Sequence, residues 1–398
     1  MRAVTKRIFL HVGSPKTGTT FLQQVLWSQR DLAREQGLLL PLDSFHDHYL
    51  ATLDVRGLTD RPDTPPRAAG IWERVVGEAR AWDGDVLVSH ELFAAATREQ
   101  ATAAVGAFGA DAEVHVVLTA RDLVRQIPAE WQEHVKHRDT LTYQEFVEQL
   151  REEPRGSWFW RVQDYPAVLQ RWSSGVPADR VHVVTVPSAG APPEQLWTRF
   201  ATLLGLDPEA FDLGGHRANT SLGYEQAELL RRVNAALGDR LPLPGPYPVD
   251  VKDLFAQTLL TRQPGAKIVL AGDDVGYAAE RSRRMADEIV ALGVDVVGDL
   301  DELVPVPPGA SPAAPQVTDG RLLEESVTAL AALLDAYSGQ RREAQELRRR
   351  MAEFEQRPVT KPVRARLASL SERSPAVMAV RRVWWRVASV LRAARDRA

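Results

Sequence analysis

One segment near the N-terminus constrains the fold of this chain more than any other. An apolar run at residues 8–10 leads into the loop 11–20, HVGSPKTGTT, and apolar residues at helical spacing follow. This order predicts a strand, a glycine-containing loop and a helix. The unpaired N–H groups and the dipole of such a helix start attract an anion, and Gly13 and Gly18 let the backbone approach it. We therefore expect a phosphate site here, with Lys16 as its point charge.

The position of the lysine indicates which phosphate chemistry is involved. A nucleoside-triphosphate P-loop reads GxxxxGK[ST], with the lysine directly after the second glycine. Here Lys16 precedes Gly18, and Thr19 stands in the place of that lysine. Residues 15–21, PKTGTTF, instead resemble without a gap the 5′-phosphosulfate loop of the sulfotransferase family. The resemblance implies 3′-phosphoadenosine 5′-phosphosulfate (PAPS) as sulfuryl donor and co-substrate.

The same resemblance implies a role for each residue of the loop. Lys16 would stabilise the charge that develops on the leaving phosphate, and the loop N–H groups with the hydroxyls of Thr19 and Thr20 would hold the 5′-phosphate. Phe21 has the family position that packs against adenine, although a core role is an equal alternative. No metal is needed, because the lysine and the loop neutralise the charge. The residues assigned to the donor in this loop are Pro15, Lys16, Thr17, Gly18, Thr19, Thr20 and Phe21.

The 3′-phosphate of the donor requires a cation of its own. Arg121 ends the apolar run 116–118 at the family position for this contact, but the serine expected eight residues later is Ala129. A structural ion pair with Asp122 or Glu130 is the alternative role for Arg121. By order in the chain, Arg217 is a second candidate for the 3′-phosphate.

A general base is expected at a strand end that faces Lys16. Glu91 and His90 follow the apolar run 86–88, where branches of the family place a catalytic Glu or His. Either group can accept a proton, and a carboxylate does so when burial raises its pKa. The resemblance favours Glu91 slightly. A helix-start glutamate beside an exposed histidine is the structural alternative.

Strand-like runs alternate with amphipathic helical segments through the first 300 residues. Such alternation predicts an α/β, P-loop-like three-layer fold, with a mostly parallel central sheet and helices on both faces. Ligands then bind at the carboxyl ends of the strands. The expected helix at 71–79 has apolar residues on one face, and the segment 268–270 is expected to be a strand before a helix that reaches Leu292. The other expected strands are 8–10, 38–40, 86–88, 114–118 and 181–186, and residues 294–303 are expected to close the body.

Composition and charge divide the chain into a body and a tail. We expect a sulfotransferase-like domain at 1–303, a proline-rich linker at 304–320 and a basic helical extension at 321–398. From Arg341 onward there are sixteen Lys or Arg against six Asp or Glu, a net charge of +10 within a total of −4. Apolar residues at 323, 327, 330, 334 and 337 give a weak coiled-coil signal, which packing onto the body explains equally well.

The last expected helix carries Val383, Trp384, Val387, Val390 and Leu391 on one face and arginines beside it. This layout suits an anionic membrane surface, and docking onto the acidic body is the competing interpretation. Without cysteines, a signal-peptide core or an 18-residue apolar stretch, the chain is expected in the cytoplasm. The oligomeric state, including a homo-oligomer, stays open.

The sequence therefore predicts a PAPS-dependent sulfotransferase that acts on a hydroxyl of a carbohydrate, lipid or secondary metabolite. We expect no nucleic-acid partner. The aromatic segments 131–138 and 158–161 suit a polar acceptor bound over ring faces, although plain helix packing explains each of them better. A nucleotide-dependent kinase, or a non-catalytic scaffold that acts through its helical tail, is the alternative function.

Overall fold

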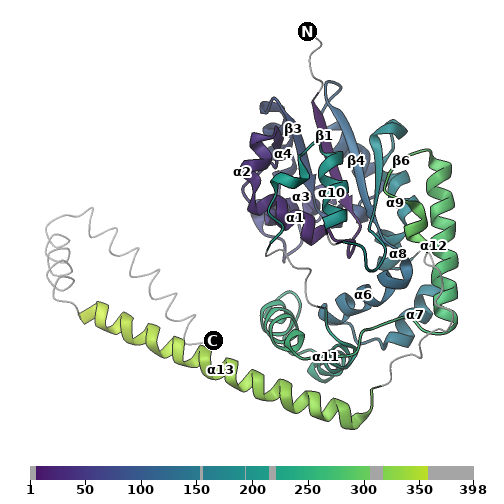
Figure 1. Cartoon of the computed structure of the whole chain (residues 1–398). Helices are drawn as coiled ribbons and strands as arrows, with labels where there is room; N and C mark the ends of the chain where they lie inside the picture. Colours follow the sequence, from purple (N-terminus) through teal and green to yellow (C-terminus); the bar gives the residue numbers. More distant parts are fainter. Residues whose placement is uncertain (1–5, 153–155, 193, 215–220, 305–316, 357–398) are drawn as a thin grey trace, which may run out of the picture. The chain divides into compact units, whose positions relative to one another are not determined.

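The body of the protein is built on one parallel sheet (Figure 1). The computed structural model describes residues 6–152, 156–192, 194–214, 221–304 and 317–356. Six strands lie in the order β2-β3-β1-β4-β5-β6, and every neighbouring pair is parallel. The strands are β1 (Arg7–Gly13), β2 (Leu38–Leu39), β3 (Asp85–Ser89), β4 (Glu113–Ala120), β5 (Val181–Thr185) and β6 (Asp295–Val297).

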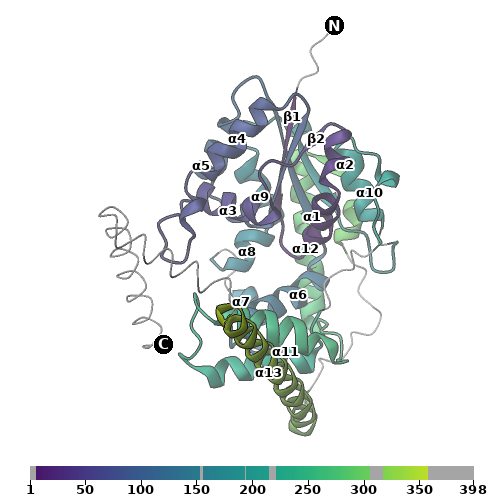
Figure 2. The same cartoon turned by 90° about the vertical axis from the view of Figure 1, so that its left-hand side faces the viewer.

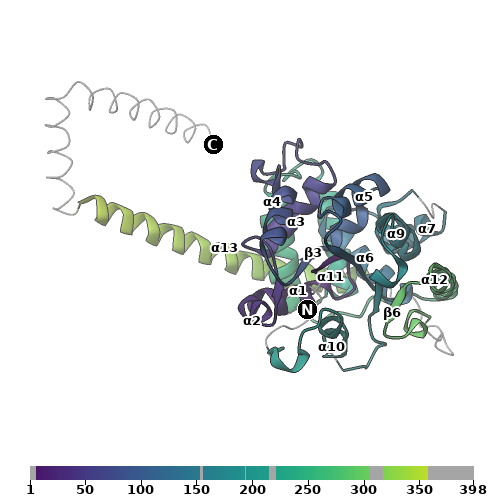
Figure 3. The ribbon, with the colours of Figure 1, turned by 90° about the horizontal axis from the view of Figure 1, so that it is seen from above.

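Helices cover both faces of this sheet (Figures 2 and 3). Alternate strand residues such as Phe9, Leu87 and Val117 join α1, α2 and α10 in one buried core, because successive side chains of a strand point to opposite faces. The helices α3, α4, α5 and α9 lie on the other face (Figure 3). The bounds of these helices are α1 (Thr19–Ser28), α2 (Arg30–Glu35), α3 (Phe45–Val55), α4 (Ile71–Ala81), α5 (Arg98–Gly106), α9 (Tyr165–Trp172) and α10 (Glu194–Leu203).

A second group of helices lies beyond the carboxyl ends of the strands, where α6, α7 and α11 gather (Figure 1). The helix α6 follows β4 almost directly, so its first turn begins beside the sheet. This placement brings α6 next to the loop that follows β1. The remaining helices are α6 (Leu123–Lys136), α7 (Tyr143–Glu152), α8 (Trp158–Gln163), α11 (Tyr224–Leu237), the π-helical η5 (Pro248–Leu259), α12 (Asp273–Leu292) and α13 (Asp319–Gln356).

The predicted fold class is confirmed, and most of the predicted elements form. The helix expected at 71–79 is α4, with Ile71, Val75 and Val76 buried. The prediction of a strand at 268–270 is wrong, because these residues have no regular secondary structure and do not belong to the sheet. Ile268 and Leu270 are buried, and the Tyr224 N–H donates to the Ala266 carbonyl oxygen at 2.8 Å. These apolar residues are therefore buried without a place in the sheet, and the segment just before them is bonded to the start of α11.

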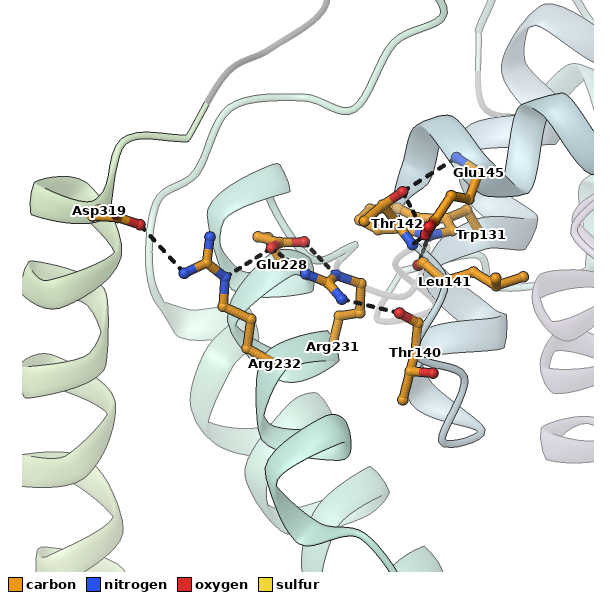
Figure 4. Close-up of polar contacts among 9 residues, drawn as sticks. All are labelled: Trp131, Thr140, Leu141, Thr142, Glu145, Glu228, Arg231, Arg232 and Asp319. Carbon is orange, nitrogen blue, oxygen red and sulfur yellow. Dashed lines mark hydrogen bonds and ion pairs between the residues drawn. The ribbon is translucent and has the colours of Figure 1, made fainter.

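The chain divides into two compact units, 1–327 and 328–398. The helix α13 begins at Asp319, close to the predicted start of the extension at 321, and its first turns belong to the first unit. They are fixed to α11 by polar contacts: Arg232 bonds Asp319 at 3.3 Å (Figure 4) and Gln226 donates to Glu325 at 2.8 Å. Most of the predicted linker, and the predicted membrane-binding helix, lie outside the described residues.

None of the helices in the described part of the chain is both long and apolar enough to cross a bilayer.

Candidate active site

The loop between β1 and α1 has the backbone shape that the sequence predicted. Gly13 and Gly18 have φ values of +126° and +87°, which favour glycine. A Cβ atom at Gly13 would lie 2.8 Å from the Glu91 carbonyl oxygen, so this position also brings the end of β1 against the segment after β3. Lys16 itself has φ +61°, an uncommon value for a residue with a side chain. The loop is therefore a tight turn directly before the N-terminus of α1.

Side-chain hydrogen bonds hold the loop in place and, within the described residues, leave the N–H groups of residues 16–21 free. The Thr17 hydroxyl donates to the Ser14 carbonyl oxygen at 2.6 Å, and the Thr119 hydroxyl at the end of β4 donates to the Gly13 carbonyl oxygen at 3.0 Å. Within the described residues, the backbone N–H groups of residues 16–21 and the hydroxyls of Thr19 and Thr20 make no hydrogen bond. These donors converge on the start of a helix, which is the arrangement that binds phosphate groups.

Lys16 contacts a carboxylate that the sequence analysis did not single out. Its Nζ lies 2.6 Å from Glu133 Oε2 in the last turns of α6. The same carboxylate is 3.1 Å from Lys252 Nζ of η5 and 3.9 Å from Lys136 Nζ. His137 Nε2 lies 3.2 Å from it. Three ammonium groups therefore share one carboxylate beside the loop.

The pKa values around Glu133 follow from this crowding of charge. Burial by itself would raise the pKa of Glu133, but Lys16, Lys252 and Lys136 together hold it well below its ordinary value. Burial lowers the pKa of Lys136 to about 8, against the opposite pull of Glu133. Burial, aided by Lys252, also lowers the pKa of His137 to about 4, so that this ring is neutral near pH 7. The cluster thus holds a surplus of positive charge that a second anion would neutralise.

Arg121 lies at the carboxyl end of β4 and contacts only neutral groups. Its Nε donates to Gln126 Oε1 at 2.8 Å, and its Nη2 donates to the Arg125 carbonyl oxygen at 3.1 Å. The ion pairs considered for it are not formed within the described residues. Asp122 caps α6 and pairs with Arg125, while Glu130 accepts from Gln163 at 2.8 Å. Burial lowers the pKa of Arg121, yet a guanidinium stays charged at any physiological pH.

Two glutamines connect the loop to the helices around it. Gln126, the partner of Arg121, donates through Nε2 to the Pro15 carbonyl oxygen at 2.6 Å. Gln163 of α8 donates to the same oxygen at 3.0 Å. Both glutamines are fully buried, so these hydrogen bonds fix the position of Lys16 relative to Arg121. Neither glutamine has a sequence signal, because each acts through a contact more than one hundred residues away along the chain.

The two candidate bases, His90 and Glu91, differ in the hydrogen bonds that their side chains already make. His90 accepts the Leu92 N–H on Nδ1 at 3.2 Å, and its ring packs against Phe45 and Tyr49. A neutral ring that accepts on Nδ1 carries its proton on Nε2 and has no free lone pair. Among the described residues, Glu91 accepts only a long 3.4 Å contact from Gln23. His90 is buried, whereas the structural alternative predicted an exposed histidine. Burial lowers its pKa, so the ring is neutral near pH 7.

The remaining predicted site residues divide between core and surface. Phe21 is half-buried and packs on the core that α1 shares with α10. Trp131, Phe159 and Trp160 are fully buried, whereas Trp158 is exposed. Plain helix packing thus accounts for the three buried rings. Arg217 lies outside the described residues.

Comparisons with family models, with curated proteins and with solved structures found no match to this chain. Among the described residues, no group of three or more His, Asp or Glu side chains is arranged to hold a metal ion. The geometry of the residues around the β1 loop is therefore the basis for any functional assignment.

Proposed function

We propose that this protein is a sulfotransferase, which transfers a sulfuryl group from PAPS to the hydroxyl of a carbohydrate, lipid or secondary metabolite. The observation that carries the proposal is the loop 14–20. Its free N–H groups, its glycine positions and Lys16 surround the start of α1 in the order PKTGTT. A phosphosulfate needs this combination of backbone donors and a cation.

Arg121 supports the choice of a donor with two separate phosphates. It lies at the end of the strand next to β1, and no carboxylate neutralises it within the described residues. A half-buried cation with only neutral partners is costly unless a ligand supplies the anion. Gln126 links it to the loop at Pro15, so one ligand with phosphates at its 5′ and 3′ positions would occupy both points.

The chemistry assigned to these residues is an in-line transfer. The acceptor oxygen attacks sulfur, the bond from sulfur to the bridging oxygen breaks, and adenosine 3′,5′-bisphosphate leaves. Lys16 would exchange Glu133 for the leaving oxygen, whose charge grows in the transition state. Glu91 would take the acceptor proton, because the Nδ1 atom of His90 is already occupied.

The acceptor class, the partners and the location of the protein belong to the same proposal. The acceptor is a small molecule, glycan or lipid, with no nucleic acid involved, and the reaction takes place in the cytoplasm. A kinase is the main rival. Its P-loop would place the lysine after Gly18, where this chain has Thr19.

Calorimetric titration with adenosine 3′,5′-bisphosphate and with ATP tests the proposal. We expect the bisphosphate to bind more tightly than ATP in the absence of magnesium. Tighter binding of ATP that depends on magnesium would instead support a kinase. Binding of neither nucleotide would support a scaffold that has kept the fold only.

A further inference from the structure

Three arginines near the proposed base form no ion pair with any residue that the structure describes. Arg56 directly follows α3, Arg61 lies in the loop after it, and Arg161 lies on α8. Their guanidinium groups also donate no hydrogen bond within the described part of the chain. By contrast, Arg67, a few residues after Arg61, pairs with Asp47 at 3.3 Å. We refer to Arg56, Arg61 and Arg161 as the arginine cluster.

The members of the arginine cluster repel one another. Arg56 is half-buried, and this burial lowers its pKa; the charges of Arg61 and Arg161 lower it further. A guanidinium keeps its charge at any physiological pH, so the cluster cannot relieve the repulsion by losing a proton. Like charges gathered at a partly desolvated place are unfavourable unless an anion binds between them.

Packing and hydrogen bonds fix the arginine cluster beside the segment that carries the proposed base. This segment is the short helix η2 (Glu91–Ala95), which follows β3 and packs against both α3 and α8. Arg171 donates to a carbonyl oxygen of η2 at 2.7 Å and to the carbonyl oxygen of Arg161 at 2.6 Å. The charge of Arg56 also lowers the pKa of His90, the residue before η2. The cluster therefore lies within electrostatic range of the base.

Two partly exposed aromatic rings lie near the same arginines. The Arg56 guanidinium lies over the ring of Trp158, at 5.5 Å from its centroid. Trp158 is 38% exposed, and Phe45, which stacks on His90, is 37% exposed. Rings of this kind can contact the apolar faces of an organic molecule while guanidinium groups bind its carboxylate, phosphate or sulfate. The combination suits an organic anion better than an inorganic one.

The sheet places the arginine cluster on the other side of the β1 loop from Arg121. The strand β1 lies between β3 and β4. Arg121 follows β4, whereas η2, beside the cluster, follows β3. A donor that joins the β1 loop to Arg121 would therefore leave the arginine cluster to the second substrate, whose hydroxyl must reach Glu91.

We propose that the acceptor carries an anionic group, which Arg56, Arg61 and Arg161 bind while the acceptor hydroxyl faces Glu91. This inference rests on the sulfotransferase activity proposed above and narrows the acceptor to acidic molecules. The shared chemistry is a carboxylate, phosphate or sulfate on a molecule that also presents a ring or another apolar face.

Calorimetric titration with matched pairs of small molecules tests the inference. Phenyl β-D-glucuronide and phenyl β-D-glucoside differ only in the carboxylate that replaces the hydroxymethyl group, and phenyl phosphate and phenol form a second pair. With the donor site filled by adenosine 3′,5′-bisphosphate, the charged member of at least one pair should bind about tenfold more tightly, the effect of one charge-assisted contact. The pair that shows this preference identifies the carboxylate or the phosphate as the anion.

Variants of the arginine cluster should remove the preference for the charged member. Arg56→Gln/Arg161→Gln should abolish it, because amides replace two guanidinium groups, whereas Arg56→Lys should keep part of it. Arg34→Gln is the matched control. Arg34 of α2 lies over the ring of Trp82 at 5.0 Å, in the same kind of contact, but on the opposite face of the sheet (Figure 3).

The melting temperature separates binding from folding. The double variant should melt no lower than the unchanged chain, since it removes charges that repel one another and bond to no described residue. The lack of a preference in both pairs would overturn the inference, and so would a preference that survives in the double variant. A clear fall in melting temperature with an unchanged preference would assign the arginines to structure.

Titration of the bisphosphate alone, and of each pair without it, distinguishes this inference from the proposed function. Tight bisphosphate binding without a preference for charge would leave the sulfotransferase in place with a neutral acceptor, and would refute the acidic one. A preference that depends on the arginine cluster in a protein that does not bind the bisphosphate would refute the proposed function. The cluster would then stand as an anion site, and its assignment to an acceptor would fail.

Discussion

Two arginines at the carboxyl ends of neighbouring strands differ in what neutralises them. Arg199 of α10 reaches the end of β5, where it bonds both carboxylate oxygens of Glu302 at 2.7 and 2.9 Å and the Thr185 carbonyl oxygen at 2.8 Å. Arg121 follows the adjacent β4, and within the described residues its guanidinium bonds only a side-chain amide and a backbone carbonyl. Two cations at the same edge of one sheet thus have opposite characters: one is part of a closed ion pair, and the other is available to an anion.

The same contrast extends to the groups around each arginine. At the β5 end, Thr185 donates to Glu302 and its hydroxyl accepts the Asp299 N–H. At the β1 and β4 ends, the N–H groups of residues 16–21 make no hydrogen bond in the part of the chain that the structure describes, and three lysines share Glu133. A charge that the protein neutralises itself serves stability, whereas a charge left in surplus serves a ligand. The predictions below test this division, beginning with the largest expected effect.

Replacement of the proposed base should give the largest loss. Glu91→Gln should lower turnover by about a hundredfold to ten-thousandfold and leave bisphosphate affinity unchanged, because the amide cannot accept the acceptor proton. His90→Asn should be milder, since Nδ1 of this histidine already accepts the Leu92 N–H. Steady-state kinetics with any identified acceptor, beside calorimetry for the donor product, measures both. A larger loss in His90→Asn would move the role to the histidine.

Lys16→Ala should reduce turnover by about a hundredfold to a thousandfold, because the lysine acts on charge that forms in the transition state. The fold should be preserved, as Lys16 is a partly exposed loop residue. Lys252→Ala is the matched control, since it removes another ammonium partner of Glu133 without touching the loop. Near-normal turnover in Lys16→Ala would contradict the proposed mechanism.

The two arginines should separate affinity from stability. Arg121→Ala should weaken adenosine 3′,5′-bisphosphate about ten- to a hundredfold, and adenosine 5′-phosphosulfate far less, because the lost contact is to the 3′-phosphate. Arg199→Ala should leave nucleotide affinity intact and should destabilise the fold by roughly 3 kcal/mol, because it leaves the largely buried carboxylate of Glu302 without its ion-pair partner. Calorimetry and thermal melting compare the two variants. Equal affinity losses for both nucleotides in Arg121→Ala would assign Arg121 to structure.

The smallest effect concerns pH. The pKa of Lys136 lies at about 8, below its ordinary value, so its charge is present below pH 8 and is lost as the pH rises through that value. Bisphosphate affinity should therefore fall a few-fold between about pH 7 and 9, because a nearby ammonium group disappears. Lys136→Met should remove this dependence in calorimetric titrations. A pH dependence that is unchanged in Lys136→Met would show that another group near the loop is responsible.

The strand at 268–270 shows where pattern alone misleads. Three apolar residues in a row have the same local pattern as those of β3, but a place in the sheet depends on a free edge beside a partner strand. The outer strands of this sheet are β2 and β6, and residues 268 and 270 are buried outside the sheet. The strands at 8–10, 86–88 and 114–118 were predictable because each is bounded by glycines, polar residues or a helix start.

The sequence by itself determined the parallel α/β architecture and the loop that closes β1. Both are local: a hydrophobic period defines each element, and the spacing of Gly13, Lys16 and Gly18 defines the turn. Only the tertiary structure decided what surrounds Lys16 and Arg121. Glu133 and Gln126 reach the loop across more than one hundred residues because β4 is the neighbour of β1 and carries α6 to that edge, and Lys252 of η5 then contacts Glu133. No local pattern encodes such contacts, since they depend on which strand ends lie side by side.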